Sequence, residues 1–135
     1  MAQAVLSHIS QWFEESVFLP LQTEESQQAL LKMFQAVDEY FQSGKRICLI
    51  GAFAMEETRD RFSLLIRQYF QDWHQALQNC LIRNGHQIDS AYIKAEEVLL
   101  GIQGALVLAR AKHDPTVFTR TLNRLKQSVF STDPM

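Results

Sequence analysis

The stretch "GIQGALVLARAKHDP", Gly101 to Pro115, combines two glycines and three alanines with aliphatic side chains in a helical pattern. Inside a helix, glycine is about 1 kcal/mol less favourable than alanine, so two glycines three residues apart require a structural reason. One side of this helix is an ordinary apolar stripe that we expect to face the core. It consists of Ala95, Val98, Leu99, Ile102, Leu106 and Ala109. The small residues lie on another side, which predicts a close approach of a second helix there.

A helix from Ala91 to Lys112 is apolar almost all round and must therefore be covered all round. The other helices of so small a domain cannot easily surround it, so we expect its small-residue side to meet a second copy of the chain. The final helix adds an apolar stripe beside it, which predicts an intermolecular four-helix bundle in a homodimer. The alternative is that the glycines accommodate a bulky neighbour of the same chain, such as Trp73. The predicted interface residues are Gly101, Gly104, Ala105, Leu108, Phe118, Leu122 and Leu125.

The length of 135 residues suits a single domain over residues 1–135. Since 47% of these residues are hydrophobic, the domain can form a hydrophobic core. The formal net charge of −2 shows no basic footprint for nucleic acid. No apolar run reaches the roughly 18 residues of a membrane span, and Met1–Ser10 lacks the pattern of a signal peptide. We therefore expect no membrane partner and a cytoplasmic location. There Cys48 and Cys80 would be reduced, buried thiols, with a disulfide or metal pair as the alternative.

Apolar residues recur at helical spacing along nearly the whole chain, and no stretch alternates cleanly with period two. This predicts an all-α, single helical domain of five to six helices. The clearest helix is long and carries an aromatic-rich face from Phe62 to Leu81. The segment Ile47 to Met55 has no readable period and is expected to be a short buried helix.

Several residues predict where helices begin and end. Pro20 is expected to stop the first helix and Thr23 to cap the second, with Glu24 and Glu25 in its first turn. Further expected ends or caps are Gly44, Asn84–Gly85, Asp89 or Ser90, and Asp114 followed by Pro115.

No arrangement of residues predicts catalysis. His8, His74, His86 and His113 are scattered, without the spacing of a metal-binding helix. The adjacent pairs Glu56–Glu57 and Glu96–Glu97 point their members to different helix faces, which suits solvated charges. We therefore expect no enzyme, no metal and no cofactor.

Three segments in order resemble the C-terminal regulatory domain of the tetracycline-repressor (TetR) family of transcription regulators. "ICLIG", Ile47 to Gly51, resembles the family's segment that opens a short helix under the ligand pocket. A long aromatic-rich helix with Trp73 near its middle follows, and "GIQGALVLARAKHDP" then leads into the last helix. The resemblance implies a transcriptional repressor whose DNA release is coupled to binding of a small molecule. It also implies DNA binding only through an N-terminal helix-turn-helix, which the chain is expected to lack.

An excess of aromatic side chains on inward faces permits two interpretations. They fill an ordinary core, or they line a chamber for a small apolar or aromatic effector, with Gln103 as the best polar group to orient it. The resemblance favours the chamber, and ligand binding would act by shifting the population of two helix arrangements. The alternative function is a ligand-free helical dimerisation or scaffold module. The predicted ligand-binding residues are Phe13, Phe34, Phe41, Cys48, Phe53, Phe62, Ile66, Tyr69, Phe70, Trp73, Leu99 and Gln103.

Overall fold

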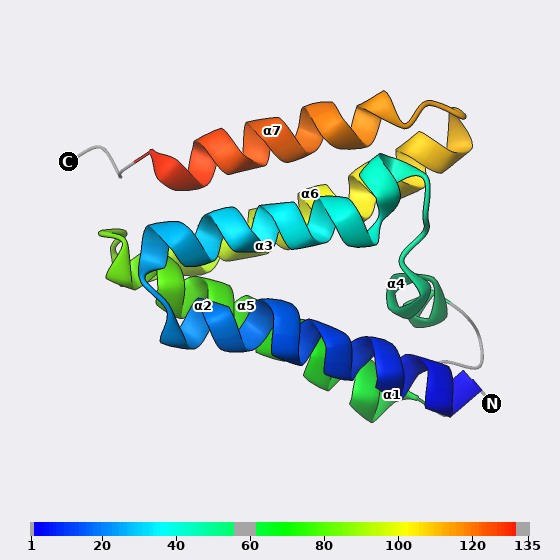
Figure 1. The fold of residues 1–135 in the computed structure, drawn as a ribbon, viewed down its shortest axis with the longest axis horizontal. Coiled ribbons are helices and arrows are strands. Elements are labelled where there is room, and N and C mark those ends of the chain that lie inside the picture. The colour runs from blue at the N-terminus through cyan, green and yellow to red at the C-terminus, as the bar shows by residue number, and fades with distance from the viewer. Residues whose placement is uncertain (1, 56–61, 132–135) are drawn as a thin grey trace.

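The fold is all-α, as expected. A computed structural model describes residues 2–55 and 62–131, apart from the side chains of Ala2 and Phe53 (Figure 1). The described helices are α1 (Ala2–Phe13), α2 (Leu19–Thr23), α3 (Ser26–Tyr40), α4 (Leu49–Ala54), α5 (Ser63–Arg83), α6 (Ile88–Ala111) and α7 (Thr116–Phe130). A π-helical turn, η1 (Glu14–Phe18), joins α1 to α2, and a 3-10 turn, η2 (Gln42–Gly44), follows α3. With α1, η1 and α2 taken as one rod, the described residues form six helical segments, and none of them is a strand.

The prediction that Pro20 stops the first helix is wrong. Proline lacks the N–H that would bond four residues back, and its ring collides with that carbonyl. Here the backbone widens into η1 just before Pro20, where the Leu19 N–H bonds to the Glu14 carbonyl five residues earlier. Pro20 then occupies the first turn of α2, a position that needs no intrahelical N–H.

The start of α3 also differs from the expectation. Thr23 does not cap α3 but ends α2, where its hydroxyl donates to the Leu19 carbonyl over 2.9 Å. The cap is Glu25, whose carboxylate accepts the Gln28 N–H at 3.0 Å. Glu25 is therefore the N-cap of α3, two residues after the predicted cap Thr23.

The short helix expected within Ile47–Met55 is present as α4, but it is only partly buried. Ile50 is fully enclosed, whereas Leu49 is exposed and Met55 lies 87% exposed just after the helix. Figure 1 shows α4 near the end of the molecule where the N-terminus lies, between α1 and the end of α3. One face of α4 therefore closes the domain and the other faces outward.

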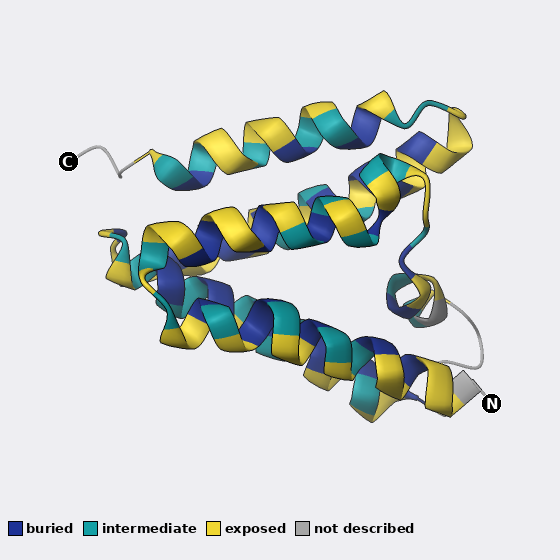
Figure 2. Cartoon of the chain, viewed as in Figure 1, coloured by how far each residue is buried: buried dark blue, intermediate teal, exposed yellow. Residues whose placement is uncertain are grey.

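The two long helices α5 and α6 run beside each other, and α7 packs against α6. Asn84 ends α5 and Gly85 follows with a φ of 107°, as expected. The cap predicted at Asp89 or Ser90 is wrong, because α6 begins at Ile88 with Gln87 at the cap position. Figure 2 shows buried and exposed positions alternating around the front helices, most clearly α3 and α7.

Asp114 acts at the start of α7 as expected. Its carboxylate accepts both the Thr116 N–H at 3.1 Å and the Thr116 hydroxyl at 2.6 Å. These bonds favour the ionised carboxylate and lower the pKa of Asp114. Pro115 itself stands at the cap position, one residue before the helix.

The centre of the domain is an aromatic cluster. The ring of Phe13 lies 5.3 Å from Tyr69 and 5.3 Å from Trp73, measured between ring centres, and 6.1 Å from Phe41. All four side chains are 1% exposed or less. The Tyr69 hydroxyl finds no partner among the described residues, and burial raises its pKa well above the ordinary value. This cluster is a filled core.

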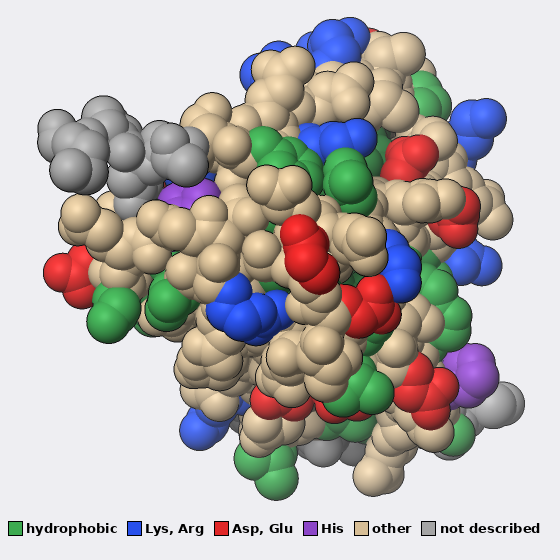
Figure 3. Space-filling view, turned by 60° about the vertical axis from the view of Figure 1, so that its left-hand side comes forward, with side chains coloured by type: hydrophobic (Ala, Val, Ile, Leu, Met, Phe, Trp, Pro, Cys, Tyr) green, Lys and Arg blue, Asp and Glu red, His purple; other side chains and the backbone are tan. Residues whose placement is uncertain are grey.

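The surface carries charges of both signs, and on the face shown in Figure 3 acidic and basic side chains are interspersed. In the described ranges, no helix is long and apolar enough to cross a membrane. The same residues contain no group of three or more potential metal ligands. Cys48 and Cys80 are both buried free thiols.

Candidate functional site

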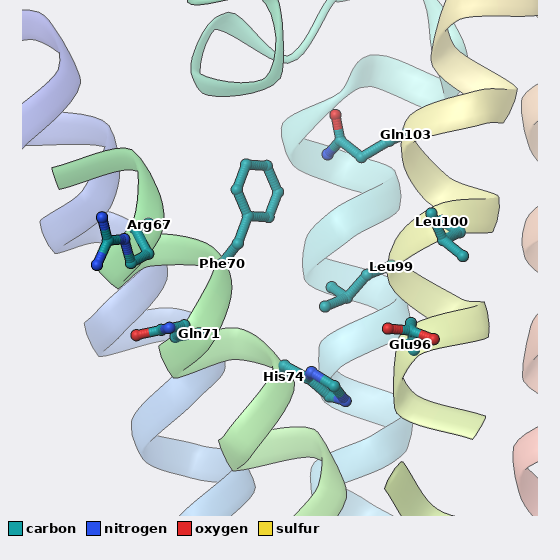
Figure 4. A pocket seen from close by; sticks show the side chains of 8 residues that line it. All are labelled: Arg67, Phe70, Gln71, His74, Glu96, Leu99, Leu100 and Gln103. Carbon is teal, nitrogen blue, oxygen red and sulfur yellow. The ribbon is translucent and has the colours of Figure 1, made fainter. Parts of the chain in front are cut away.

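Two connected cavities lie beside α6. The smaller, of about 350 Å³, separates α5 from α6 and is shown in Figure 4. The larger is a groove of about 1450 Å³ between α6 and the segment that runs from Gly44 through α4. Phe70, Leu100 and Gln103 line both, so the two spaces meet at these side chains. Phe70 comes from α5 and Gln103 from α6, and Figure 4 shows them reaching toward each other across the gap.

Gln103 is the polar group at this junction. Its side-chain nitrogen Nε2 is buried and makes no hydrogen bond of normal geometry to the described residues. The Gln103 side chain nevertheless lies close enough to the Cys48 sulfur to lower the pKa of that thiol. A buried amide without a partner costs roughly 1–3 kcal/mol, which a guest with an acceptor atom would recover. Gln103 is therefore placed to orient a bound molecule.

Gly51 of α4 is the surface on which the Gln103 amide rests. A Cβ atom added at Gly51 would lie 2.2 Å from Gln103 Oε1, and 3.5 Å from the Cys48 sulfur. The glycine therefore lets α4 approach the amide closely. The three residues bring α4 and α6 together at the inner wall of the groove.

Cys48 offers little reactivity. Burial raises the pKa of its thiol. The Gly51 N–H, which lies 3.4 Å from the sulfur, the Gln103 side chain and the Ile50 backbone oppose this only in part. A thiol with a raised pKa carries little thiolate at neutral pH, and the thiolate is the nucleophile. The site is thus suited to reversible, non-covalent binding between apolar walls.

One end of the groove is basic. Lys45, Arg46, Arg110 and His113 line it there, and we call these four residues the basic rim. Arg46 is held in place, since it donates to the Tyr40 carbonyl at 3.2 Å and its guanidinium lies 4.9 Å from the centre of the Tyr40 ring. Gly44 brings this end of the groove against the start of α7, where its backbone meets Pro115 and Phe118.

The structure brings only some of the predicted ligand-binding residues to the cavities. Cys48, Phe70, Leu99 and Gln103 line one or both of them. The others whose side chains are described are not among the lining residues, because they pack on one another in the core or beside it. These are Phe13, Phe34, Phe41, Phe62, Ile66, Tyr69 and Trp73. Phe53 was also predicted to bind the ligand, but its side chain lies outside the described part of the structure.

The two glycines on the small-residue side of α6 have different surroundings. Gly101 is explained within the chain, because an added Cβ would lie 2.8 Å from the Leu125 side chain of α7. Gly104 faces open space, since no atom of the described residues lies within 4 Å of an added Cβ. Neither glycine accommodates Trp73. Of the other residues predicted for an interface, Ala105, Phe118 and Leu122 are buried within the single chain, at 4%, 0% and 8% exposure. Leu125 is partly buried and Leu108 is exposed.

A continuous exposed apolar stripe remains on α6. Leu100 and Val107 are each 66% exposed and Leu108 is 54% exposed, with Gly104 between them. Sequence analysis missed Leu100 and Val107 as surface residues, although it noted that this helix is apolar all round. Their seven-residue spacing with Ile93, also exposed, was the available signal.

The basic rim and Leu100 were not expected to line the groove, and each of them is unremarkable along the chain. Gly51 was expected near the pocket only as the end of the segment Ile47 to Gly51. They become one site only when α4 folds back against the C-terminal half of α6.

Comparison with known families gives one match. Residues 23–124 match the family described as "Transcriptional regulator LmrA/YxaF-like, C-terminal domain". The match covers α3 to most of α7, and therefore both cavities. The same comparison found no matching curated protein and no matching solved structure.

Proposed function

The chain belongs to the family of C-terminal domains of LmrA/YxaF-like transcriptional regulators, a TetR-type family, and from this premise we propose that it is the effector-binding and dimerisation domain of a TetR-like transcriptional repressor. The effector is a small, mainly apolar molecule that binds where the two cavities meet, between α4, α5 and α6. The protein acts in the cytoplasm, and it performs no catalysis.

One observation carries this proposal: an apolar cavity contains a buried amide donor, Gln103 Nε2, that has no described partner. Sites for small molecules are typically concave and apolar with a few placed polar groups, and their volumes are about 300–1000 Å³. The smaller cavity falls in that range, and the groove extends it. Phe70 and Leu99 supply apolar walls on either side of the amide.

Dimerisation is proposed through the exposed stripe of Leu100, Gly104, Val107 and Leu108 on α6. These four residues also line the outer side of the groove, so a second copy would cover the groove there and leave the effector the inner part between α4, Phe70 and Gln103. A monomer rarely leaves such a contiguous apolar patch in water. Gly104 allows the same helix of a second copy to approach closely, since nothing of its own chain fills the space there. Leu125 of α7 flanks the stripe and would complete a four-helix bundle.

The effector would act by binding one arrangement of helices more tightly than another. α4 forms one wall of the groove and also contacts α1, the first helix of the chain. A ligand that moves α4 would therefore move α1, and with it any DNA-reading head attached ahead of it. Two such heads must match half-sites about one DNA turn apart, so a change in their separation releases the operator.

A second candidate function rests on the filled aromatic core. The interior around Phe13, Tyr69 and Trp73 is packed without a guest, which suits a dimerisation or scaffold module that binds no ligand.

A thermal-shift screen against apolar and aromatic compounds separates these two functions. A ligand present at 100 times its Kd stabilises the folded state by about 2.7 kcal/mol, which is easily seen as a rise in Tm. The variant Gln103→Leu should lose affinity for hits that carry an acceptor atom, whereas Gln75→Leu, on the exposed side of α5, should not. Absence of any stabilising compound supports the scaffold, and hits unaffected by Gln103→Leu contradict the proposed site.

A further inference from the structure

We infer that the groove takes an elongated amphiphile with an anionic group at one end, of the kind exemplified by a long-chain carboxylate. This inference rests on the proposed function and names the chemical class of its effector. The juxtaposition that carries it is an apolar groove that has the basic rim at one end and the Gln103 amide at the other.

The size of the groove favours a long guest. About 1450 Å³ exceeds what one compact, drug-sized molecule requires. Gln103 and Arg110 are seven residues apart on α6, close to two full turns, so they lie on the same side of the helix about 10 Å apart along its axis. Between them the groove is lined by the buried Leu106, and Ile47 and Met55 also line it. A guest whose anionic group lies at the basic rim would therefore extend its apolar chain along about 10 Å of the groove toward Gln103.

The charges of the rim favour an anion. Among the described residues that line the groove, none is acidic. The ion pairs recorded in the described ranges join Lys32 to Glu24 and Lys94 to Glu97, and neither involves the rim. Asp114 follows His113 directly in sequence, but its carboxylate already accepts two hydrogen bonds from Thr116.

Arg46 is preorganised for this role. A guanidinium has five N–H donors, and the recorded hydrogen bond to the Tyr40 carbonyl uses only one side of it. Its position over the Tyr40 ring limits the conformational entropy that binding a carboxylate would otherwise cost. The remaining donors can bind a carboxylate in the bidentate manner that guanidinium groups favour.

The test compares three probes of equal chain length below their micelle-forming concentrations: decanoate, decanol and decylammonium. Isothermal titration calorimetry on the intact chain should show decanoate binding about tenfold more tightly than decanol. Two partly exposed charge contacts, each of which raises the affinity about threefold, together give this factor. Decylammonium should bind least tightly. The preference for decanoate should also weaken as salt is added.

Matched variants locate the effect. The double variant Arg46→Gln/Arg110→Gln should bind decanoate and decanol equally, while decanol affinity stays unchanged. Arg124→Gln, an exposed position on α7 that does not line the groove, should keep the full preference. A urea titration of each variant confirms that it is folded.

Each other outcome overturns the inference. Equal binding of decanoate and decanol by the unmodified chain refutes the anionic class but leaves an apolar effector, and thus the proposed function, intact. If no probe binds, the long-chain class is wrong, and the screen described above decides separately whether the domain has an effector. Sedimentation of the chain with phosphatidylglycerol vesicles would indicate recognition of a membrane surface and contradict binding of a free amphiphile; we expect the chain to stay in the supernatant.

Discussion

Replacing Gly44 by alanine should strongly destabilise the domain, because this residue has neither the conformation nor the space for a side chain. Its φ is 94°, in the left-handed region, where a residue with a Cβ pays about 1–2 kcal/mol. The added Cβ would lie 2.6 Å from the Phe118 Cβ and 2.9 Å from the Pro115 carbonyl oxygen. Carbon atoms normally approach to about 3.5–4.0 Å.

Neither neighbour of Gly44 can move easily. The Pro115 carbonyl accepts the Phe118 N–H at 3.0 Å and so belongs to the first turn of α7, and the Phe118 Cβ is fixed to the same helix. Overpacking of this kind costs about 1–3 kcal/mol, for a total of about 2–5 kcal/mol. That is a large share of the roughly 5–15 kcal/mol by which a domain is stable.

Urea unfolding followed by circular dichroism measures the loss, and Gly85→Ala is the matched control. Gly85 has a φ of 107° but nothing within 4 Å of an added Cβ. It should therefore show only the conformational penalty of about 1–2 kcal/mol. Equal losses in the two variants would refute the claim that the segment at Gly44 packs tightly on α7 and closes that end of the groove.

Three further predictions concern the dimer, the core and the start of α7. Gly104→Leu should fold normally, since its Cβ has open space in the single chain, yet sediment as monomer or aggregate; an unchanged dimer would contradict the proposed interface. Tyr69→Phe should raise the free energy of unfolding by about 1 kcal/mol, because it removes a buried hydroxyl without a described partner, and a loss in urea unfolding would show that the hydroxyl is satisfied. Asp114→Asn should destabilise the domain at neutral pH but not in acid. The pKa of Asp114 is lower in the folded state than its unfolded value of about 3.8. The stability that its carboxylate contributes is therefore present above the unfolded pKa and is lost as the pH falls through the folded value. If the urea midpoints of the two proteins still differ at low pH, this explanation is wrong.

The helices with clear periodicity were predictable from sequence. The apolar face of α5 repeats over about five turns, and burial of Ile66, Tyr69, Trp73 and Leu77 confirms it. Pro20 was misleading because its usual effect depends on a regular helix before it. The π-helical turn that accommodates it was not expected from the local sequence.

The site was harder to predict, because a periodic pattern shows which side chains face inward but not whether they meet one another or a space. Phe13 and Trp73 face inward and fill the core, while Phe70 faces inward and borders a cavity. Likewise, a glycine indicates a close approach without identifying the neighbour. Gly101 proved to approach Leu125 of its own chain, whereas Gly104 has no neighbour within it.

The central claim is that an effector binds at Gln103, between α4 and α6, and not within the aromatic core. The most direct measurement is a ¹⁵N NMR titration with a stabilising compound from the thermal-shift screen, observing two side-chain signals, the Gln103 amide and the Trp73 indole N–H. Both nitrogens are buried without a described partner, so each should respond sharply to a guest nearby. We predict a large shift of the Gln103 amide and little change at Trp73; a shift of the indole with an unchanged Gln103 amide would place the guest in the core and contradict the account.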